Sequence, residues 1–450
     1  MLTFVIAIAL AGQADMTAPA AAMIDGRPSA REVSPLQPLV DAAPAGSTLE
    51  IPPGRYVGDV FVDKPLRLVG RGRPVLVGST AGSVIRVRAA GVVIEGLDID
   101  GLGGGDLGRD ASGIHIAAHD AVVRDCRIVN TLFGVYLREA DGTLVERTTI
   151  RGIPGKDAGE KGSGIHVWNT NGFRLVGNTI ADVRDGLYIQ SSSGGFIAKN
   201  TARDLRYGIH YMFSDDNVFE DNVFENGAAG SALMYSRRIA FRRNQFLHNR
   251  GFASVGLLLK ACDDVVAEDN LIADNARGIF LEGSYHNRFR RNIIAESDTA
   301  IVLYDSSGDN RFEQNSFVAN LTPLSLVGKR TDTAFDGNYW SDHHEPDLDG
   351  DGRSDRPYRL SSVFDHLRSN LTAADLFTQS FAAAALGAAE RTFPVLDAIP
   401  VEDHAPLARP PALPDVPRGT AGARGPNAAG LAAAAAMLVF GLGAIARVRS

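Results

Sequence analysis

Short apolar segments separated by polar corners recur along most of this chain, and one four-residue phrase marks each recurrence. Glycine or alanine, then an apolar, a variable and an apolar residue, is found at 113–116, 134–137, 164–167, 186–189, 208–211, 256–259, 278–281 and 300–303. Because strand side chains alternate between two faces, this period of two predicts β-strands with one buried face.

A second periodic feature is an asparagine within a short segment of strand character. Successive members lie 22, 22, 22, 26, 22 and 23 residues apart. They are Asn178, Asn200, Asn222, Asn244, Asn270, Asn292 and Asn315. A period near 22 with strand alternation is typical of a β-solenoid. We therefore predict an all-β, right-handed parallel β-helix over residues 23–345, with roughly twelve coils between about 45 and 340.

Stacking of the coils explains why asparagine can be buried at this position. Equivalent residues of neighbouring coils lie about 4.8 Å apart, so each amide can bond to the next. Earlier coils carry Cys126 and Thr148 there, which makes Cys126 a structural thiol. Cys262 lies several coils away, so we do not expect the two cysteines to pair.

The variable residue of the phrase points outward, opposite to its apolar neighbours. With the register around 231–235 open by one residue, the expected outward column is His115, Tyr136, His166, Tyr188, His210, Leu233, Leu258, Phe280 and Val302. Two residues further along, the same face carries Trp168, Met212 and Met234.

Histidine and methionine together suit a soft metal ion such as Cu(I). His210 and Met212 face the same way on one strand, and Met234 follows on the next coil. His166 lies two coils from His210, about 10 Å away, which is too far for one shared coordination shell. The hypothesis is an open, transient copper site. The competing interpretation is a ring ladder on a half-exposed sheet, with an apolar docking patch at its end.

The stretch 347-DLDGDGRSD-355 predicts a calcium loop. Carboxylates fill positions 1, 3, 5 and 9 of the loop, as Asp347, Asp349, Asp351 and Asp355. The carbonyl of Arg353 is at position 7, whereas Tyr358 replaces the usual glutamate at position 12. We expect a structural calcium ion in a cap over 346–360. A solvated acidic turn is the alternative.

Both ends of the chain carry apolar segments. Residues 2–12 predict a signal peptide over 1–22, with a buried strand as the alternative. Residues 428–446 carry no charge and precede two arginines, which predicts a transmembrane helix, with a tail that packs on a partner as the alternative. Between them, 361–398 is expected to be helical and 399–427 a Pro/Ala-rich linker.

The net charge and the positions of the acidic residues limit the function classes that this chain can belong to. A formal net charge of −8 argues against nucleic acid as a partner, because phosphate binding needs a basic surface. β-Solenoids also carry polysaccharide-active sites, which need clustered carboxylates or a His/Tyr pair with arginine. The candidates are Asp185, Asp204, Asp215, Asp216, Arg184 and Arg206, single residues in turns where aspartate is common. A polysaccharide-active or carbohydrate-binding protein is therefore the second function class.

Three stretches resemble the NosD family: 208-GIHYMFSDDN-217, 337-GNYWSDHHEPDLDGDGRSDRPYR-359 and 389-AERTFPVL-396. The resemblance covers residues 45–398. It implies a periplasmic accessory protein that is not an enzyme and that supports maturation of the copper centres of nitrous oxide reductase by handling copper or a sulfur species. The implied partners are an ABC ATPase, a membrane permease, a copper chaperone and nitrous oxide reductase.

Carried onto this sequence, the resemblance makes His210 and Met212 the hypothesis for a copper-handling point, with His166, Trp168 and Met234 as weaker neighbours on the same face. Docking of partners without a bound metal stays open. The segment 428–446 departs from a simple soluble periplasmic subunit and implies an anchor in the inner membrane. We expect the helical stretch 362–391 to contact the permease.

Overall fold

The structure is a computed structural model that describes residues 34–104, 111–251, 254–328, 330–360 and 401–411. The signal peptide expected at 1–22, the helical segment at 361–398 and the transmembrane helix at 428–446 lie outside these residues. Within the described ranges, no helix is long and apolar enough to cross a membrane.

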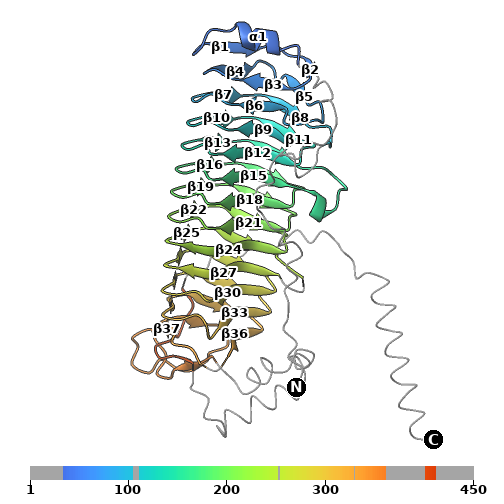
Figure 1. Ribbon diagram of the computed structural model, residues 1–450. Coiled ribbons are helices and arrows are strands. Elements are labelled where there is room, and N and C mark those ends of the chain that lie inside the picture. The colour runs from blue at the N-terminus through green and yellow to red at the C-terminus, as the bar shows by residue number, and fades with distance from the viewer. Residues whose placement is uncertain (1–33, 105–110, 252–253, 329, 361–400, 412–450) are drawn as a thin grey trace, which may run out of the picture.

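The described chain winds into a parallel β-helix, as the repeat predicted, and Figure 1 shows the coils stacked along one axis. From β1 to β36 each coil contributes one strand to each of three sheets, so neighbours within a sheet differ by three in strand number. The 13-stranded sheet gives one coil more than the roughly twelve expected.

The strand bounds follow sheet by sheet. The 15-stranded sheet contains β1 Thr48–Ile51, β4 Arg67–Gly70, β7 Val93–Glu95, β10 Val122–Arg124, β13 Leu144–Glu146, β16 Arg174–Val176, β19 Phe196–Ala198, β22 Val218–Glu220, β25 Ala240–Arg242, β28 Val266–Glu268, β31 Arg288–Arg290, β34 Arg311–Glu313, β37 Ala334–Asp336, β40 Glu402–Asp403 and β39 Tyr358–Arg359. The 13-stranded sheet contains β2 Arg55–Val57, β5 Val75–Val77, β8 Asp98–Asp100, β11 Arg127–Val129, β14 Thr149–Arg151, β17 Thr179–Ala181, β20 Thr201–Arg203, β23 Val223–Glu225, β26 Gln245–Leu247, β29 Leu271–Ala273, β32 Ile293–Ala295, β35 Ser316–Val318 and β38 Tyr339–Trp340.

The 12-stranded sheet carries the repeated phrase and the outward column. Its strands are β3 Val60–Val62, β6 Ile85–Val87, β9 Ser112–Ile116, β12 Phe133–Arg138, β15 Ser163–Trp168, β18 Asp185–Gln190, β21 Tyr207–Met212, β24 Ala229–Arg237, β27 Val255–Asp263, β30 Arg277–Glu282, β33 Thr299–Tyr304 and β36 Thr322–Val327. The described helices are α1, Gln37–Ala42, and a 3₁₀ turn, Ala158–Glu160.

A ladder of buried asparagines runs along the inside of the solenoid. In each step, the backbone N–H and the side-chain amide of one residue donate to Oδ1 of the next. Asn200 donates to Asn222 over 2.9 Å from both groups, and its amide also donates to the carbonyl of Leu175 at 2.9 Å. Because every buried amide is satisfied by its neighbours, the ladder holds the coils in one register.

The ladder ends on an aspartate. Asn338 donates its backbone and side-chain N–H groups to Asp403 at 2.9 Å, and Trp340 Nε1 donates to the same carboxylate at 3.1 Å. A carboxylate accepts without donating, so no further coil is needed. Residues 401–411, expected as part of a linker, therefore close the solenoid instead: β40 pairs with β37 and β39.

The assignment of one residue to the expected outward column is wrong. Ala232, not Leu233, is the register partner of His210, and Leu233 is buried in the core. The sequence misled because Ser231 occupies an inward position that is apolar in the neighbouring coils. The shift leaves Met212 and Met234 as register partners.

Candidate functional site

The glycine of the phrase fixes how β21 and the neighbouring strands of the 12-stranded sheet begin. A Cβ at Gly208 would collide with the carbonyl oxygen of Gly230 and lie 2.7 Å from the ring of Phe224. Glycine is therefore needed for the coils to approach at this corner. The residues just before the glycine, Asp185 and Tyr207, reach the outward column from there.

From His115 to His210 the outward column is a continuous series of ring contacts. Tyr136 and His166 stack with centroids 4.4 Å apart, and His166 stacks on Tyr188 at 4.3 Å. His115 meets Tyr136 edge-on at 5.2 Å, and His210 meets Tyr188 edge-on at 4.8 Å. Tyr188 therefore separates His166 from His210, as the ladder spacing predicted.

The histidines at the start of the column are neutral. Burial lowers the pKa of His115 to about 4, with Arg86 and Arg138 adding to the effect. Burial also lowers the pKa of His166 to about 3. Among the described residues, both ring nitrogens of His115 and Nδ1 of His166 have no hydrogen-bond partner. These rings therefore serve mainly to stack.

His210 has different surroundings. Its Nδ1 lies 3.2 Å from Oδ2 of Asp185 and 3.3 Å from a guanidinium nitrogen of Arg206. Tyr207 packs edge-on against the ring at 5.3 Å. Arg206 could only donate to a bare Nδ1, whereas the ionised carboxylate of Asp185 can only accept from an Nδ1–H. Because the hydrogen bond from His210 helps to lower the pKa of Asp185, we assign the proton to Nδ1. This tautomer leaves Nε2 with its lone pair.

Asp185 is a buried, ionised carboxylate with an exposed fraction of 0%. Arg206 binds both of its oxygens, at 2.9 and 2.7 Å, and Arg184 approaches Oδ2 at 3.3 Å. Burial by itself raises the pKa of Asp185, but the hydrogen bonds from His210 and Arg206 outweigh it and lower the pKa to about 2. Asp185 is therefore suited to orient His210 and not to donate a proton.

The thioethers lie beside this group. Met212 is two residues beyond His210 on β21, and Met234 pairs with it from β24. Both side chains are partly exposed. The structure thus places three of the four residues proposed for copper on the same face of two adjacent strands and leaves His166 two coils away.

Sequence reasoning missed the residues that orient His210. Asp185 was treated as a single residue in a turn, and Arg206 was not connected with the column. The available signal was their position, because each lies one or two residues before the glycine of its phrase, in DGLYI and RYGIH. The other acidic candidates do not join them: Asp215 and Asp216 form ion pairs with Arg238 at 3.2 and 2.6 Å.

Comparison with known proteins identifies the family. A family model described as periplasmic copper-binding protein (NosD) matches residues 149–345. A protein of Pseudomonas aeruginosa, named probable ABC transporter binding protein NosD, is 30% identical over 377 residues, which cover 80% of this chain and 87% of that protein. The chain belongs to the NosD family. A NosD protein of Stutzerimonas stutzeri with the same name is 30% identical over 381 residues, 80% of this chain and 86% of that one.

Solved structures share the fold of this NosD-family chain. An exopolygalacturonase of Yersinia enterocolitica has a TM-score of 0.52 at 12% identity, over 66% of this chain and 74% of its own. The Dettilon tailspike protein has a TM-score of 0.50 at 12% identity, over 63% and 61%. At this identity the likeness shows the fold alone. The NosD relatives are named as binding proteins and not as enzymes.

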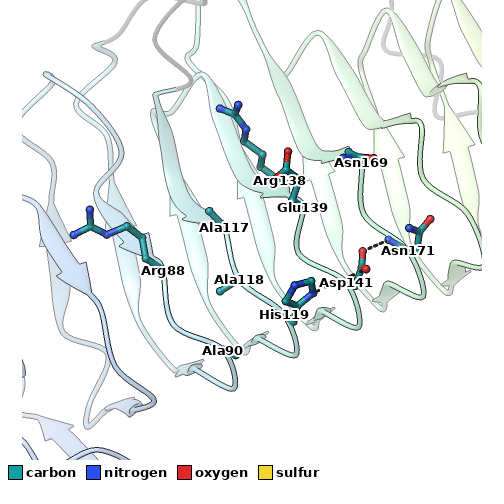
Figure 2. A pocket seen from close by; sticks show the side chains of 10 residues that line it. All are labelled: Arg88, Ala90, Ala117, Ala118, His119, Arg138, Glu139, Asp141, Asn169 and Asn171. Carbon is teal, nitrogen blue, oxygen red and sulfur yellow. Dashed lines mark hydrogen bonds and ion pairs between the residues drawn. The ribbon is translucent and has the colours of Figure 1, made fainter.

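An open groove of about 610 Å³ lies where several strands of the 12-stranded sheet end, nearer the N-terminus than His210. Figure 2 shows His119 directed toward Asp141, whose carboxylate accepts a hydrogen bond from the backbone of Asn171 at 2.6 Å. Arg138 at its edge lies over the ring of Trp168 at 5.1 Å. The acidic residues considered for a polysaccharide-active site do not line this groove.

The acidic loop after β38 gathers three carboxylates. Oxygens of Asp347, Asp349 and Asp351 lie within 4.8 Å of one another. Backbone N–H groups of the loop hold them in place, as in the bonds from Gly350 and Gly352 to Asp347 at 2.7 and 3.0 Å. A hard cation with oxygen ligands fits this donor set. Asp355 instead accepts from the backbone of Leu348 at 2.6 Å, and the Arg353 guanidinium lies 3.6 Å from Asp336.

Proposed function

We propose that this NosD-family chain handles copper in the periplasm, as the solenoid subunit of an ABC-type complex that serves maturation of the copper centres of nitrous oxide reductase. The family description and the names of the relatives support the periplasm, copper and an ABC transporter. ATP hydrolysis would take place in a partner ATPase beside a membrane permease, and a copper chaperone and the reductase would be the donor and the acceptor.

The observation that carries the proposal is the pairing of His210 with Asp185 next to two methionines. Metal-binding histidines commonly donate their second ring N–H to a carboxylate, which fixes the ring and raises its basicity. Here the carboxylate of Asp185 would accept the hydrogen bond from Nδ1 of His210, so Nε2 of the same ring would bind the ion. The thioethers of Met212 and Met234 are soft ligands that suit Cu(I).

The small number of ligands suits cargo rather than a resident cofactor. One imidazole and two thioethers on a partly exposed sheet face leave room for ligands from a donor or an acceptor. His166 would not share the ion, because Tyr188 lies between the two imidazoles. Its role would be limited to the ring stack.

The cysteines favour copper over a sulfur species as the cargo. The chain has two cysteines, Cys126 and Cys262, and both are free and buried. Burial raises the pKa of Cys126 to about 11 and that of Cys262 to about 12, so both stay protonated at neutral pH. Because the thiolate is the reactive form, neither is suited to carry sulfur.

The acidic loop would add a structural calcium ion. Asp347, Asp349 and Asp351 would hold it with the Arg353 carbonyl, and Asp355 would support the loop from the ninth position. The ion would offset two of the three negative charges and stiffen the cap over the last coil.

Cu(I) titration of the full-length chain against a chromogenic chelator tests the proposal. The wild-type chain should bind Cu(I) stoichiometrically, and the His210→Asn/Met212→Leu variant should lose that binding. The matched control is His248→Asn, since His248 also donates to a carboxylate, Asp274 at 2.7 Å, but belongs to another face. A wild-type chain that takes up no Cu(I) would refute copper handling and leave a scaffold that orders its partners.

A further inference from the structure

A fixed positive charge lies beside the imidazole of the proposed copper site. A guanidinium nitrogen of Arg206 lies 3.3 Å from Nδ1 of His210. The same guanidinium packs over the ring of Tyr207, with its central carbon 4.4 Å from the ring centroid. It also donates to both oxygens of Asp185. These contacts hold the cation in place, so an ion bound to Nε2 of the same imidazole would lie close to it.

A second arginine reaches the same carboxylate. Nε of Arg184 lies 3.3 Å from Oδ2 of Asp185, the oxygen that is also 3.2 Å from Nδ1 of His210. Within the described chain, neither Arg184 nor Arg206 forms an ion pair with any other carboxylate. The three ionised side chains, called here the arginine cluster, are two guanidinium groups against one carboxylate. The cluster therefore carries an excess positive charge.

The other charges on this sheet face do not cancel the excess. Lys260 is the register partner of Met234 and forms an ion pair with Glu282 at 3.0 Å, so these two charges balance. Arg138 at the end of β12 and Arg277 at the start of β30 add further positive charge on either side. Between β12 and β30, the described face is therefore positive overall.

Carboxylates do occur around the next corner of the same coils. The ionised residues there are Asp215, Asp216, Arg237, Arg238, Asp263 and Asp264. The backbone turns at Phe213 and Tyr235, which separates these residues from the sheet face, and Arg238 pairs with two of the carboxylates. Solvent and salt screen charges at such exposed positions, whereas Arg206 contacts the imidazole itself. The arginine cluster therefore dominates the field at the proposed site.

The ligands proposed for the ion are all neutral. Nε2 of His210 and the thioethers of Met212 and Met234 bring no negative charge. Zinc sites in proteins commonly include thiolate or carboxylate ligands, which offset the charge of the divalent ion. Asp185 cannot serve in this way, because it is fully buried and both of its oxygens accept hydrogen bonds from Arg206. The repulsion from a fixed cation grows in proportion to the charge of the ion, so a divalent ion meets twice the repulsion of a monovalent one.

We propose that Arg184 and Arg206 determine the metal selectivity of this site, because their excess positive charge admits Cu(I) and rejects divalent ions such as Zn(II). This selectivity rests on the proposed function, since it concerns the same ligands. It gives a role to the second arginine. Arg206 already offsets the charge of Asp185 and binds both of its oxygens, whereas Arg184 adds charge through a single contact.

Competitive titration of the full-length chain with Cu(I) and with Zn(II), each against a chelator, tests the selectivity. Arg184→Gln removes one charge and leaves Asp185 in contact with Arg206 and His210. The affinity should rise about threefold for Cu(I) and about tenfold for Zn(II), so the change for Zn(II) on a logarithmic scale is about twice that for Cu(I). Binding that remains in the His210→Asn variant belongs to other parts of the chain, such as the acidic loop, and is subtracted.

Two further variants separate charge from structure. Arg184→Lys keeps the charge and should keep the wild-type affinity for both ions. Arg174→Gln removes an arginine that lies over the ring of Phe196 at 4.9 Å on the 15-stranded sheet, and it should change neither affinity. Equal factors for the two ions in Arg184→Gln, or the same gains in Arg184→Lys, would overturn the selectivity.

The same titrations distinguish the selectivity from the proposed function. If the wild-type chain binds Cu(I) at His210 but Arg184→Gln gains no affinity for Zn(II), the selectivity is wrong and copper handling stands. If the wild-type chain binds no Cu(I) at His210, the proposed function is refuted and the selectivity with it.

Discussion

Replacement of Asp185 by asparagine tests how the site is held together. The carboxylate accepts from His210 and twice from Arg206, and its exposed fraction is 0%. Removing one partner of a buried ion pair costs about 3 to 5 kcal/mol. Because the Arg206 side chain keeps 36% of its surface exposed, water can solvate the freed guanidinium. We therefore expect a loss of about 3 kcal/mol in the free energy of unfolding.

The shifted pKa of Asp185 gives a second measure of the same contacts. Its pKa falls from 3.8 in the unfolded chain to about 2 in the fold. At about 1.4 kcal/mol per pKa unit, this corresponds to about 2 kcal/mol of stability. Since the folded pKa is the lower one, this contribution is fully present above about pH 4 and is lost as the pH falls toward about 2.

The functional consequence is separate from stability. Asparagine cannot keep the proton of His210 on Nδ1 by charge, so Nε2 would no longer be reserved for the ion. We expect the affinity for Cu(I) to fall about 10- to 100-fold. Chemical denaturation at several pH values measures the first effect, and competitive Cu(I) titration of the folded variant measures the second.

The matched control is Asp274→Asn. Asp274 likewise accepts from a histidine and an arginine, His248 at 2.7 Å and Arg250 at 2.7 Å. This variant should lose stability and keep the wild-type affinity for Cu(I). A folded Asp185→Asn chain that also binds Cu(I) with wild-type affinity would refute the idea that Asp185 positions His210.

Three further predictions concern the scaffold. Asn222→Ala removes four ladder hydrogen bonds, two accepted from Asn200 and two donated to Ile197 and Asn244. The free energy of unfolding, measured by chemical denaturation, should fall by about 4 kcal/mol. The exposed Asn169 is the control position, and an equal loss there would contradict the ladder's role. Gly208→Ala should cost about 3 kcal/mol by overpacking, since its Cβ has no room. Gly159→Ala, where φ is ordinary and a Cβ meets nothing, is the control and should cost little. Calcium at one hundred times its dissociation constant should raise the free energy of unfolding by about 2.7 kcal/mol. The Asp349→Asn/Asp351→Asn variant should lose this gain. A wild-type chain whose stability does not change when calcium is chelated would exclude the ion.

The repeat determines most of the fold from sequence alone. Because each coil contacts mainly its neighbours, a period near 22 residues and strand alternation were sufficient to predict the parallel β-helix, its inward apolar faces and the outward ring column. At Ser231 an inward position is polar, so the predicted register was displaced by one residue and Leu233 was assigned to the wrong face. Strand alternation was also sufficient to predict that His210, Met212 and Met234 share one outward face.

What only the tertiary structure decided is how residues from different coils meet. Asp185, Arg206 and His210 come together because stacking places the corner before one glycine beside the ring column of the next coil, and no spacing within a single coil specifies that contact. Asp403 closes the asparagine ladder from 65 residues beyond Asn338, a partner that the repeat does not contain. Local alternation sets the direction of a side chain, whereas its charge partners depend on register between coils, which emerges when the whole array is packed.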